Sequence, residues 1–106
     1  MDIVIHEGSQ VAGSARIIFI DDTTAKIKNF TVLPEYRGKN VGRALMGKIE
    51  DYLKEKSVKK SIIDSPKFIK GFYEKFGYNQ EGEEFTIHDV PTVKMTKIAA
   101  SLRSSQ

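Results

Sequence analysis

The spacing of apolar residues predicts several strands and one long helix in the first half of the chain. Apolar runs at 3–5, 11–20 and 26–33 have the length of strands, and residues 21–24 are typical of a hairpin turn. Apolar side chains occupy both faces of 11–20, which favours a strand covered by other elements. Residues 41–56 repeat apolar positions at helical spacing: Val41, Leu45, Ile49, Tyr52 and Leu53.

The second half predicts a strand, a helix and a hairpin. Residues 58–64 are typical of a buried strand, and after a helix such a strand most easily pairs in parallel with the strand before it. Ser65 and Pro66 are typical of an N-cap and a first helical residue, and Gly77 is a good residue to end that helix. Segments 85–87 and 92–98 predict a hairpin with its bend at 88–91, and residues 99–106 predict a frayed tail.

Together these elements predict one α/β (α+β) domain over residues 1–98, with a mixed, mostly antiparallel sheet of about six strands and two main helices. The chain has 106 residues, enough for one modest core, and its 40% hydrophobic and 29% charged residues are ordinary for a globular protein. There is no cysteine, no apolar run long enough to span a membrane, and no basic region typical of a signal peptide. We therefore expect a cytoplasmic protein with no membrane partner.

The net charge of +3 is too small to indicate nucleic-acid binding by itself. The lysines at 54, 56, 59 and 60 lie at or just beyond the end of the long helix, where cations complement the helix dipole. Nucleic-acid binding stays the weakest hypothesis because no aromatic residues alternate with these lysines. His6 and His88 are isolated, so we expect no metal site.

The segment from Val32 to Leu45 joins a strand to the long helix through a basic, glycine-containing loop. The first N–H groups of a helix have no partner within the helix, and the dipole places partial positive charge there. Arg37, Lys39 and Arg43 add three cations, and the next carboxylate is Glu50. This pattern predicts a site for pyrophosphate or a similar polyanion, with a solvated basic turn as the alternative.

Two glycines leave alternatives open. Gly42 lies in the first turn of the long helix, where it costs helix stability. It indicates either a ligand that approaches closely or simple packing of the helix on the sheet. Gly13 indicates either a β-bulge or the close approach of a neighbouring element.

The chain resembles the GNAT superfamily of N-acetyltransferases in two motifs. Residues 32–45 resemble motif A, whose pattern is Arg/Gln-x-x-Gly-x-Gly/Ala, and here residues 37–42 are Arg-Gly-Lys-Asn-Val-Gly. Asn40 replaces the first glycine, and asparagine tolerates the left-handed backbone that the loop needs. Residues 71–78, Gly-Phe-Tyr-Glu-Lys-Phe-Gly-Tyr, resemble motif B, and residues 84–95 resemble the closing strands of a bacterial branch. The resemblance covers residues 3–97.

This resemblance implies a GNAT-like acyl-CoA N-acyltransferase fold, with acetyl-CoA as co-substrate and a primary amine as acceptor. The acetyl group would move by direct attack in a ternary complex. It also implies that the two strands beside the loop splay apart to admit the pantetheine arm. The residues implied to contact the cofactor are Val32, Leu33, Arg37, Gly38, Lys39, Asn40, Val41, Gly42, Arg43 and Phe72.

The catalytic residue that the resemblance implies is Tyr73, which would protonate the departing thiolate. A phenol has a pKa of about 10 and keeps its proton at neutral pH. The alternative is that Tyr73 only packs in the apolar stripe of the second helix. A base for the amine is not specified by the sequence, and His88 and Asp64 are the two candidates.

The chain differs from the usual family pattern at its start. Family members open with a strand and two helices that form one wall of the acceptor site, and this chain resembles a short form without them. We therefore expect that a partner subunit, for instance a second copy in a homodimer, completes the site. The alternative function is a non-catalytic acyl-CoA-binding or interaction module.

Overall fold

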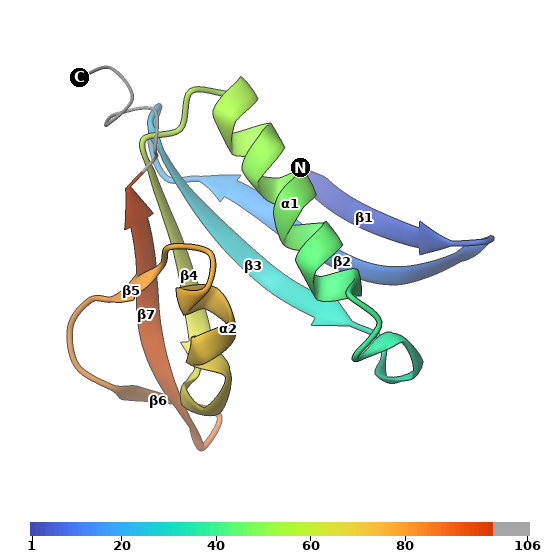
Figure 1. Ribbon diagram of the computed structural model, residues 1–106. Helices are drawn as coiled ribbons and strands as arrows, with labels where there is room; N and C mark the ends of the chain where they lie inside the picture. Colours follow the sequence, from blue (N-terminus) through green and yellow to red (C-terminus); the bar gives the residue numbers. More distant parts are fainter. Residues whose placement is uncertain (99–106) are drawn as a thin grey trace.

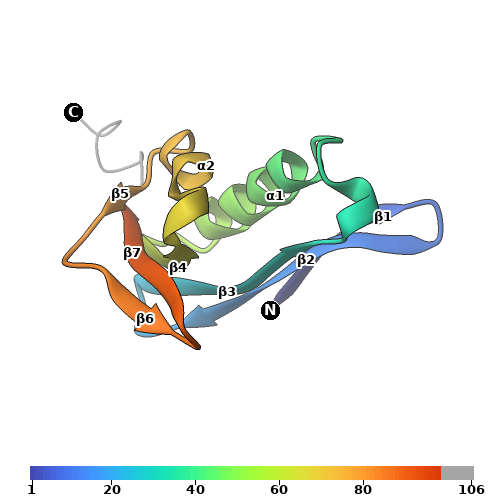
Figure 2. The same cartoon turned by 90° about the horizontal axis from the view of Figure 1, so that it is seen from below.

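In the computed structural model, which describes residues 1–98, a twisted seven-stranded sheet carries its helices on one face (Figures 1 and 2). The expected frayed tail, residues 99–106, lies outside the described residues. No helix of the described chain is long and apolar enough to cross a membrane. In chain order the elements are β1 (Asp2–Glu7), β2 (Gln10–Phe19), β3 (Thr24–Val32), η1 (Pro34–Tyr36), α1 (Val41–Glu55), β4 (Lys60–Pro66), η2 (Lys67–Ile69), α2 (Lys70–Glu74), β5 (Asn79–Gln80), β6 (Phe85–Ile87) and β7 (Val90–Ile98).

The sheet confirms the predicted mixed, mostly antiparallel topology. Its strand order is β1-β2-β3-β4-β7-β5, and β6 pairs with β7. The strands β3 and β4, joined through α1, run parallel as expected, whereas the other described pairs are antiparallel. The additional strand β5 has two residues, which is too short to leave a periodic pattern in the sequence.

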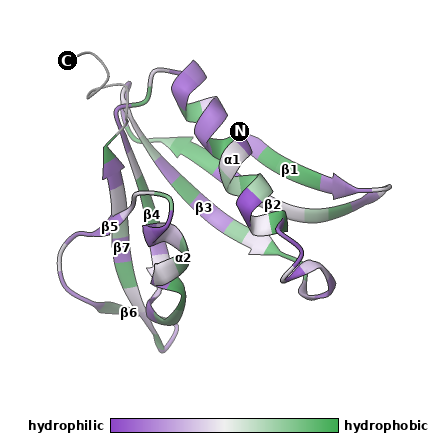
Figure 3. Cartoon of the chain, in the orientation of Figure 1, coloured by the Kyte–Doolittle hydropathy of each residue, from purple (hydrophilic) through white to green (hydrophobic). Residues whose placement is uncertain are grey.

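The core lies between the helices and the sheet. Helix α1 buries its predicted stripe except Tyr52, which is partly buried, and Leu45, Met46 and Ile49 are fully enclosed. Alternate residues of the strands point towards it, and Figure 3 shows this as alternating hydrophobic and hydrophilic bands along β3 and β7. The sheet residues that complete the core include Ala15, Ile17, Ala25, Ile27, Ile63, Val93 and Met95.

The prediction for the start of the second helix is wrong. Ser65 and Pro66 end β4, where they pair with Val93 and Thr92 of β7. The Ser65 hydroxyl donates to the Pro66 carbonyl at 2.9 Å, so it caps no helix, and helical geometry begins only at Lys67. Sheet pairing with a distant strand outweighs the local capping preference here.

The predicted end of that helix is confirmed. Gly77 has φ +90°, and its N–H donates to the Glu74 carbonyl at 3.1 Å. The Tyr78 N–H donates to the Tyr73 carbonyl at 3.2 Å. This is the Schellman arrangement, in which a left-handed glycine closes a helix.

The final hairpin has a tighter bend than predicted. His88 and Asp89 have φ of 48° and 65° and form a two-residue turn, while Pro91 lies inside β7 opposite Thr86. Left-handed backbone at both central residues matches the twist of the flanking strands. The other predicted strands and the first helix end within two residues of the observed bounds.

Gly13 of β2 marks the place where α1 meets the sheet most closely. A Cβ atom at Gly13 would lie 3.0 Å from Val41 Cγ1 and 3.2 Å from the Thr31 carbonyl oxygen. The close-approach alternative is therefore confirmed, and a register shift also lies beside it, between Ile5 and His6 on β1. Gly47, in the exposed middle of α1, has no neighbour within 4 Å of a Cβ.

These two glycines should respond oppositely to alanine. We expect Gly13→Ala to lower the free energy of unfolding by about 1–3 kcal/mol, because the added methyl group overpacks the contact with α1. Gly47→Ala should raise it by about 0.5–1 kcal/mol through helix propensity. Urea unfolding of both variants measures the difference, and equal effects of one sign would contradict this account.

Candidate functional site

The strands β3 and β4 separate just before the basic loop. Their parallel pairing ends at Ile27 and Ile63, yet β3 continues to Val32 and β4 to Pro66. Asn29 has φ 56° and lies in a bulge where the β2–β3 register shifts. The bulge and the loss of pairing confirm the splay that the family resemblance implied.

A cavity of about 700 Å³ lies between β3, the N-terminal end of α1 and the η2–α2 segment. Eight of the residues implied by the family resemblance line it: Val32, Arg37, Gly38, Asn40, Gly42, Arg43, Phe72 and Tyr73. Sequence reasoning missed Phe30, Thr31, Tyr36, Phe68 and Ile69, which also line it. Tyr36 lies inside the first motif, and the other four lie within three residues of one of the two motifs.

The loop before α1 presents backbone N–H groups without acceptors. Gly38 and Asn40 have φ of 79° and 66°, so asparagine adopts the left-handed conformation as predicted. The first intrahelical bond runs from the Ala44 N–H to the Asn40 carbonyl at 3.0 Å, and no side chain caps the helix. In this loop and the first turn of α1, the N–H groups of Gly38, Asn40, Val41, Gly42 and Arg43 have no acceptor among the described residues.

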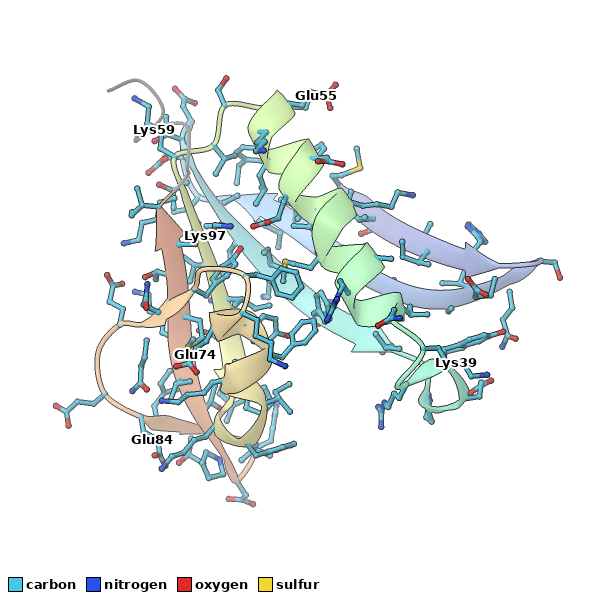
Figure 4. All side chains as sticks on the ribbon, viewed as in Figure 1. Lys39, Glu55, Lys59, Glu74, Glu84 and Lys97 are labelled. Carbon is cyan, nitrogen blue, oxygen red and sulfur yellow. The ribbon has the colours of Figure 1, made fainter. Side chains whose placement is uncertain are left out.

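Two of the three predicted cations belong to the cavity. Arg37 Nε donates to the Val32 carbonyl at 3.3 Å and so holds the loop on the end of β3. Arg43 lies in the first turn of α1, which contains no acidic residue. Lys39, labelled in Figure 4, does not line the cavity, and its Nζ lies 5.8 Å from the centre of the Tyr36 ring.

The structure also leaves Leu33 and Val41 outside the cavity. The Leu33 N–H donates to the Ala12 carbonyl at 2.9 Å, and its carbonyl accepts from Tyr36, so neither group is free. Successive N–H groups of an extended strand point in opposite directions, so the Val32 N–H faces away from β2. The side chain of Val41 is buried against Gly13.

Tyr73 belongs to the hydrophobic core and also lines the cavity. It is 3% exposed, and its ring packs edge-on against Phe30 and Phe72 with centroids 5.7 and 5.1 Å away. Its hydroxyl has no hydrogen-bond partner among the described residues, and the residue lines the cavity. Burial, together with the nearby Tyr78, raises the pKa of the Tyr73 hydroxyl well above its usual value, so the phenol keeps its proton.

Comparison with known proteins identifies the family. Residues 2–99 match the family model of the acetyltransferase (GNAT) domain. The chain belongs to the GNAT acetyltransferase family. The GNAT chain is 33% identical over 96 residues to the YyaT protein of Bacillus subtilis, covering 90% of this chain but 63% of that protein. It therefore spans less than two thirds of this relative.

Solved structures share the GNAT fold of this chain. Escherichia coli ElaA matches with a TM-score of 0.83 and 22% identity, over 91% of this chain and 66% of that one. A GNAT family acetyltransferase from Elizabethkingia anophelis, solved with acetyl-CoA bound, matches with a TM-score of 0.77 and 18% identity over 91% and 74%.

Gly42 of this GNAT chain lies at the wall of the cavity. It lines the cavity, and a Cβ there would lie 3.4 Å from Phe72 Cζ and 3.7 Å from Val32 Cγ2. Both distances are ordinary van der Waals contacts, so the fold itself would accept a methyl group at this position. The cavity would narrow if residue 42 carried a side chain.

The two candidate bases lie apart from each other in this GNAT fold. Asp64 lies on β4, and its Oδ2 forms an ion pair with Lys26 Nζ at 3.0 Å. His88 is exposed at the tip of the last hairpin. Among residues 1–98 no group of three His, Cys, Asp or Glu side chains could hold a metal ion.

A smaller cavity of about 140 Å³ at the other end of α1 contains part of the lysine cluster. Lys97 of this cavity donates to Glu50 at 2.6 Å, and Lys60 pairs with Glu81 at 3.4 Å. Lys56 lies 5.8 Å from the centre of the Tyr52 ring. Several of these cations thus have structural partners, which weakens the nucleic-acid hypothesis.

The buried Tyr78 beneath this GNAT site predicts a loss of stability at alkaline pH. Burial raises the pKa of Tyr78 to about 12, and its hydroxyl pairs with Ser61 at 2.8 Å. Because the unfolded state ionises first, this contribution is complete below pH 10 and is lost as pH rises towards 12. We expect Tyr78 to contribute a loss of about 2–3 kcal/mol across this window, measured by urea unfolding. An unchanged slope in Tyr78→Phe would contradict the assignment.

Proposed function

We propose that this chain binds acetyl-CoA in the large cavity and transfers the acetyl group to a primary amine. The observation that carries the proposal is that four features lie together in one cavity. These are the splayed strands, the unpaired N–H groups, two arginines and a buried, protonated tyrosine. The family membership of the chain and the acetyl-CoA complex of a structural neighbour support the same reading.

The loop and α1 would bind the pyrophosphate. Unpaired N–H groups at a helix N-terminus and charge-assisted bonds from arginine both favour a polyanion. The pantetheine arm would lie in the gap between β3 and β4, where the Val32 N–H faces away from β2. An extended arm can pair there like an additional strand, beside the rings of Phe30 and Phe72.

The reaction would need two contributions from the protein. As the neutral amine attacks the thioester carbon, negative charge develops on the carbonyl oxygen, and a backbone N–H of β3 would stabilise it. As the carbon–sulfur bond breaks, the thiolate takes a proton from the Tyr73 hydroxyl, while the amine nitrogen loses a proton to solvent and solvent restores the proton of Tyr73. The high pKa of Tyr73 keeps that proton available across the physiological range.

Calorimetric titration and a thiol-release assay test the proposal together. We expect acetyl-CoA and coenzyme A to bind with dissociation constants on the order of 1–100 µM. Pantetheine without the nucleotide should bind much more weakly, because it lacks the phosphates that the loop recognises. Thiol release above background with a panel of primary amines would support transfer, and no binding of either coenzyme form would overturn the proposal.

A non-catalytic acyl-CoA-binding module is the second candidate. The observation that favours it is the sheet face opposite the helices, which no helix of residues 1–98 covers (Figure 2). An acceptor bound there would have little shelter unless a partner, such as a second copy, adds a wall. Tight binding of acetyl-CoA without thiol release would favour this module.

A further inference from the structure

Asp64 stands on the helix-free face at the point where β3 and β4 part. Ile27 and Ile63 form the last pair between these strands, and Asp64 is the next residue of β4. Because Ile63 belongs to the core beneath the helices, alternation along the strand places Asp64 on the other face. Its side chain is 27% exposed and pairs with Lys26 of the same face at 3.0 Å.

An apolar surface continues from Asp64 along this face. Pro66 lies two residues further on β4, about 6.6 Å away. Pro66 pairs with Thr92, and Thr92 pairs with Phe85, so these residues share a face. The next row is the pair Val90 and Ile87. The large side chains of this surface are apolar and yet exposed to solvent: Phe85 by 39%, Ile87 by 40% and Val90 by 37%.

The carboxylates around this surface lie beside cations: Asp64 pairs with Lys26 at 3.0 Å and lies opposite Lys94 of β7. Glu81 is shared by Lys94 at 3.2 Å and Lys60 at 3.4 Å, so two cations already surround it. The cavity on the helix side has no carboxylate among its lining residues. Asp64 directly follows the last β3–β4 pair, so an ammonium that approaches the gap from the helix-free face would meet its carboxylate there.

We propose that Asp64 and the apolar surface formed by Pro66, Phe85, Ile87 and Val90 bind the acceptor. The acceptor class is a primary amine that carries an aromatic or branched aliphatic group and no second positive charge. Its ammonium pairs with Asp64 and its apolar group covers the hairpin. The inference rests on the proposed function, because it places the acceptor on the opposite side of the gap from acetyl-CoA.

A comparison of amines tests the acceptor class. Binding of 2-phenylethylamine, ethanolamine and 1,5-diaminopentane is measured by calorimetry with and without saturating coenzyme A, so that the result does not depend on turnover. We expect 2-phenylethylamine to bind about tenfold more tightly than either of the others, because it buries its ring. Equal affinities would overturn the inference, whereas a failure of coenzyme A itself to bind would overturn the proposed function.

Two variants separate a binding role of Asp64 from a structural one. Asp64→Asn and Lys26→Met both break the same ion pair. If Asp64 binds the ammonium, Asp64→Asn weakens 2-phenylethylamine binding about tenfold, whereas Lys26→Met retains or strengthens it by removing a competing cation. Asp22→Asn, at the exposed turn between β2 and β3, is the matched control and should change little. Equal losses in the two ion-pair variants would overturn the inference.

The hairpin is tested by a nearly isosteric change. We expect Val90→Thr to reduce the preference for 2-phenylethylamine over ethanolamine about fivefold, by making the surface polar. Ile98→Thr, an exposed apolar residue at the other end of β7, is the control. A dimer in light scattering that dissociates on Val90→Thr, with unchanged amine preference, would assign the surface to a second copy and overturn the inference.

Discussion

Reversing the charges of Arg37 and Arg43 together is expected to weaken coenzyme A binding at least about a hundredfold. Each arginine lines the cavity beside the unpaired N–H groups of the loop, and each reversal replaces an attraction for phosphate by a repulsion. Arg43→Glu should act almost purely through charge, since Arg43 has no ion-pair partner among the described residues. Arg37→Glu also removes the bond to the Val32 carbonyl, so the loop should loosen as well.

Lys39→Glu is the matched control for this prediction. It changes the net charge by the same amount as either arginine reversal alone, but Lys39 lies over Tyr36 and does not line the cavity. We expect a loss of about threefold or less, and this loss should disappear at high salt because it reflects screened, long-range attraction. Calorimetric titration with coenzyme A at two salt concentrations provides the measurement. Equal losses for Lys39→Glu and Arg43→Glu would show that the loop attracts anions only through its overall charge.

The site loop was predictable because its chemistry is local. A run of unpaired N–H groups follows from the start of any helix, and the cations beside it are visible in sequence. Even the left-handed backbone of Asn40 followed from the residue type. The sequence does not show in which direction each side chain of the loop points. Lys39 was therefore grouped with Arg37 and Arg43, although it packs on Tyr36.

The errors arose where distant residues decide local structure. Ser65 and Pro66 have strong helix-start preferences, but β7 pairs with them from almost thirty residues away and keeps them in a strand. Phe30 was not predicted to lie at the site, because the pattern of a strand does not reveal the bulge at Asn29. This bulge turns the ring of Phe30 towards α2. Periodic spacing in the sequence shows which side of a helix or strand is apolar. It does not show where two neighbouring elements leave a space between them, and the cavity is such a space.

Tyr73→Phe is expected to lower the rate of acetyl transfer about a hundredfold while leaving acetyl-CoA affinity almost unchanged. The ring of Tyr73 is held by Phe30 and Phe72, and phenylalanine preserves those contacts. The hydroxyl has no partner among the described residues, so its removal leaves no buried group unsatisfied. Loss of the proton donor should therefore appear in the chemical step alone. Single-turnover thiol release isolates that step from product release.

Tyr78→Phe distinguishes this role from a general need for a buried hydroxyl. Tyr78 is 1% exposed and bonds to Ser61, but it does not line the cavity, so its loss should cost stability and leave the single-turnover rate near that of the native protein. The raised pKa of Tyr73 adds a second constraint: the rate should show no fall from ionisation of this residue between pH 7 and the usual tyrosine pKa of 10. An unchanged single-turnover rate in Tyr73→Phe would remove the tyrosine from the mechanism, and the thiolate would then leave without a proton from the protein.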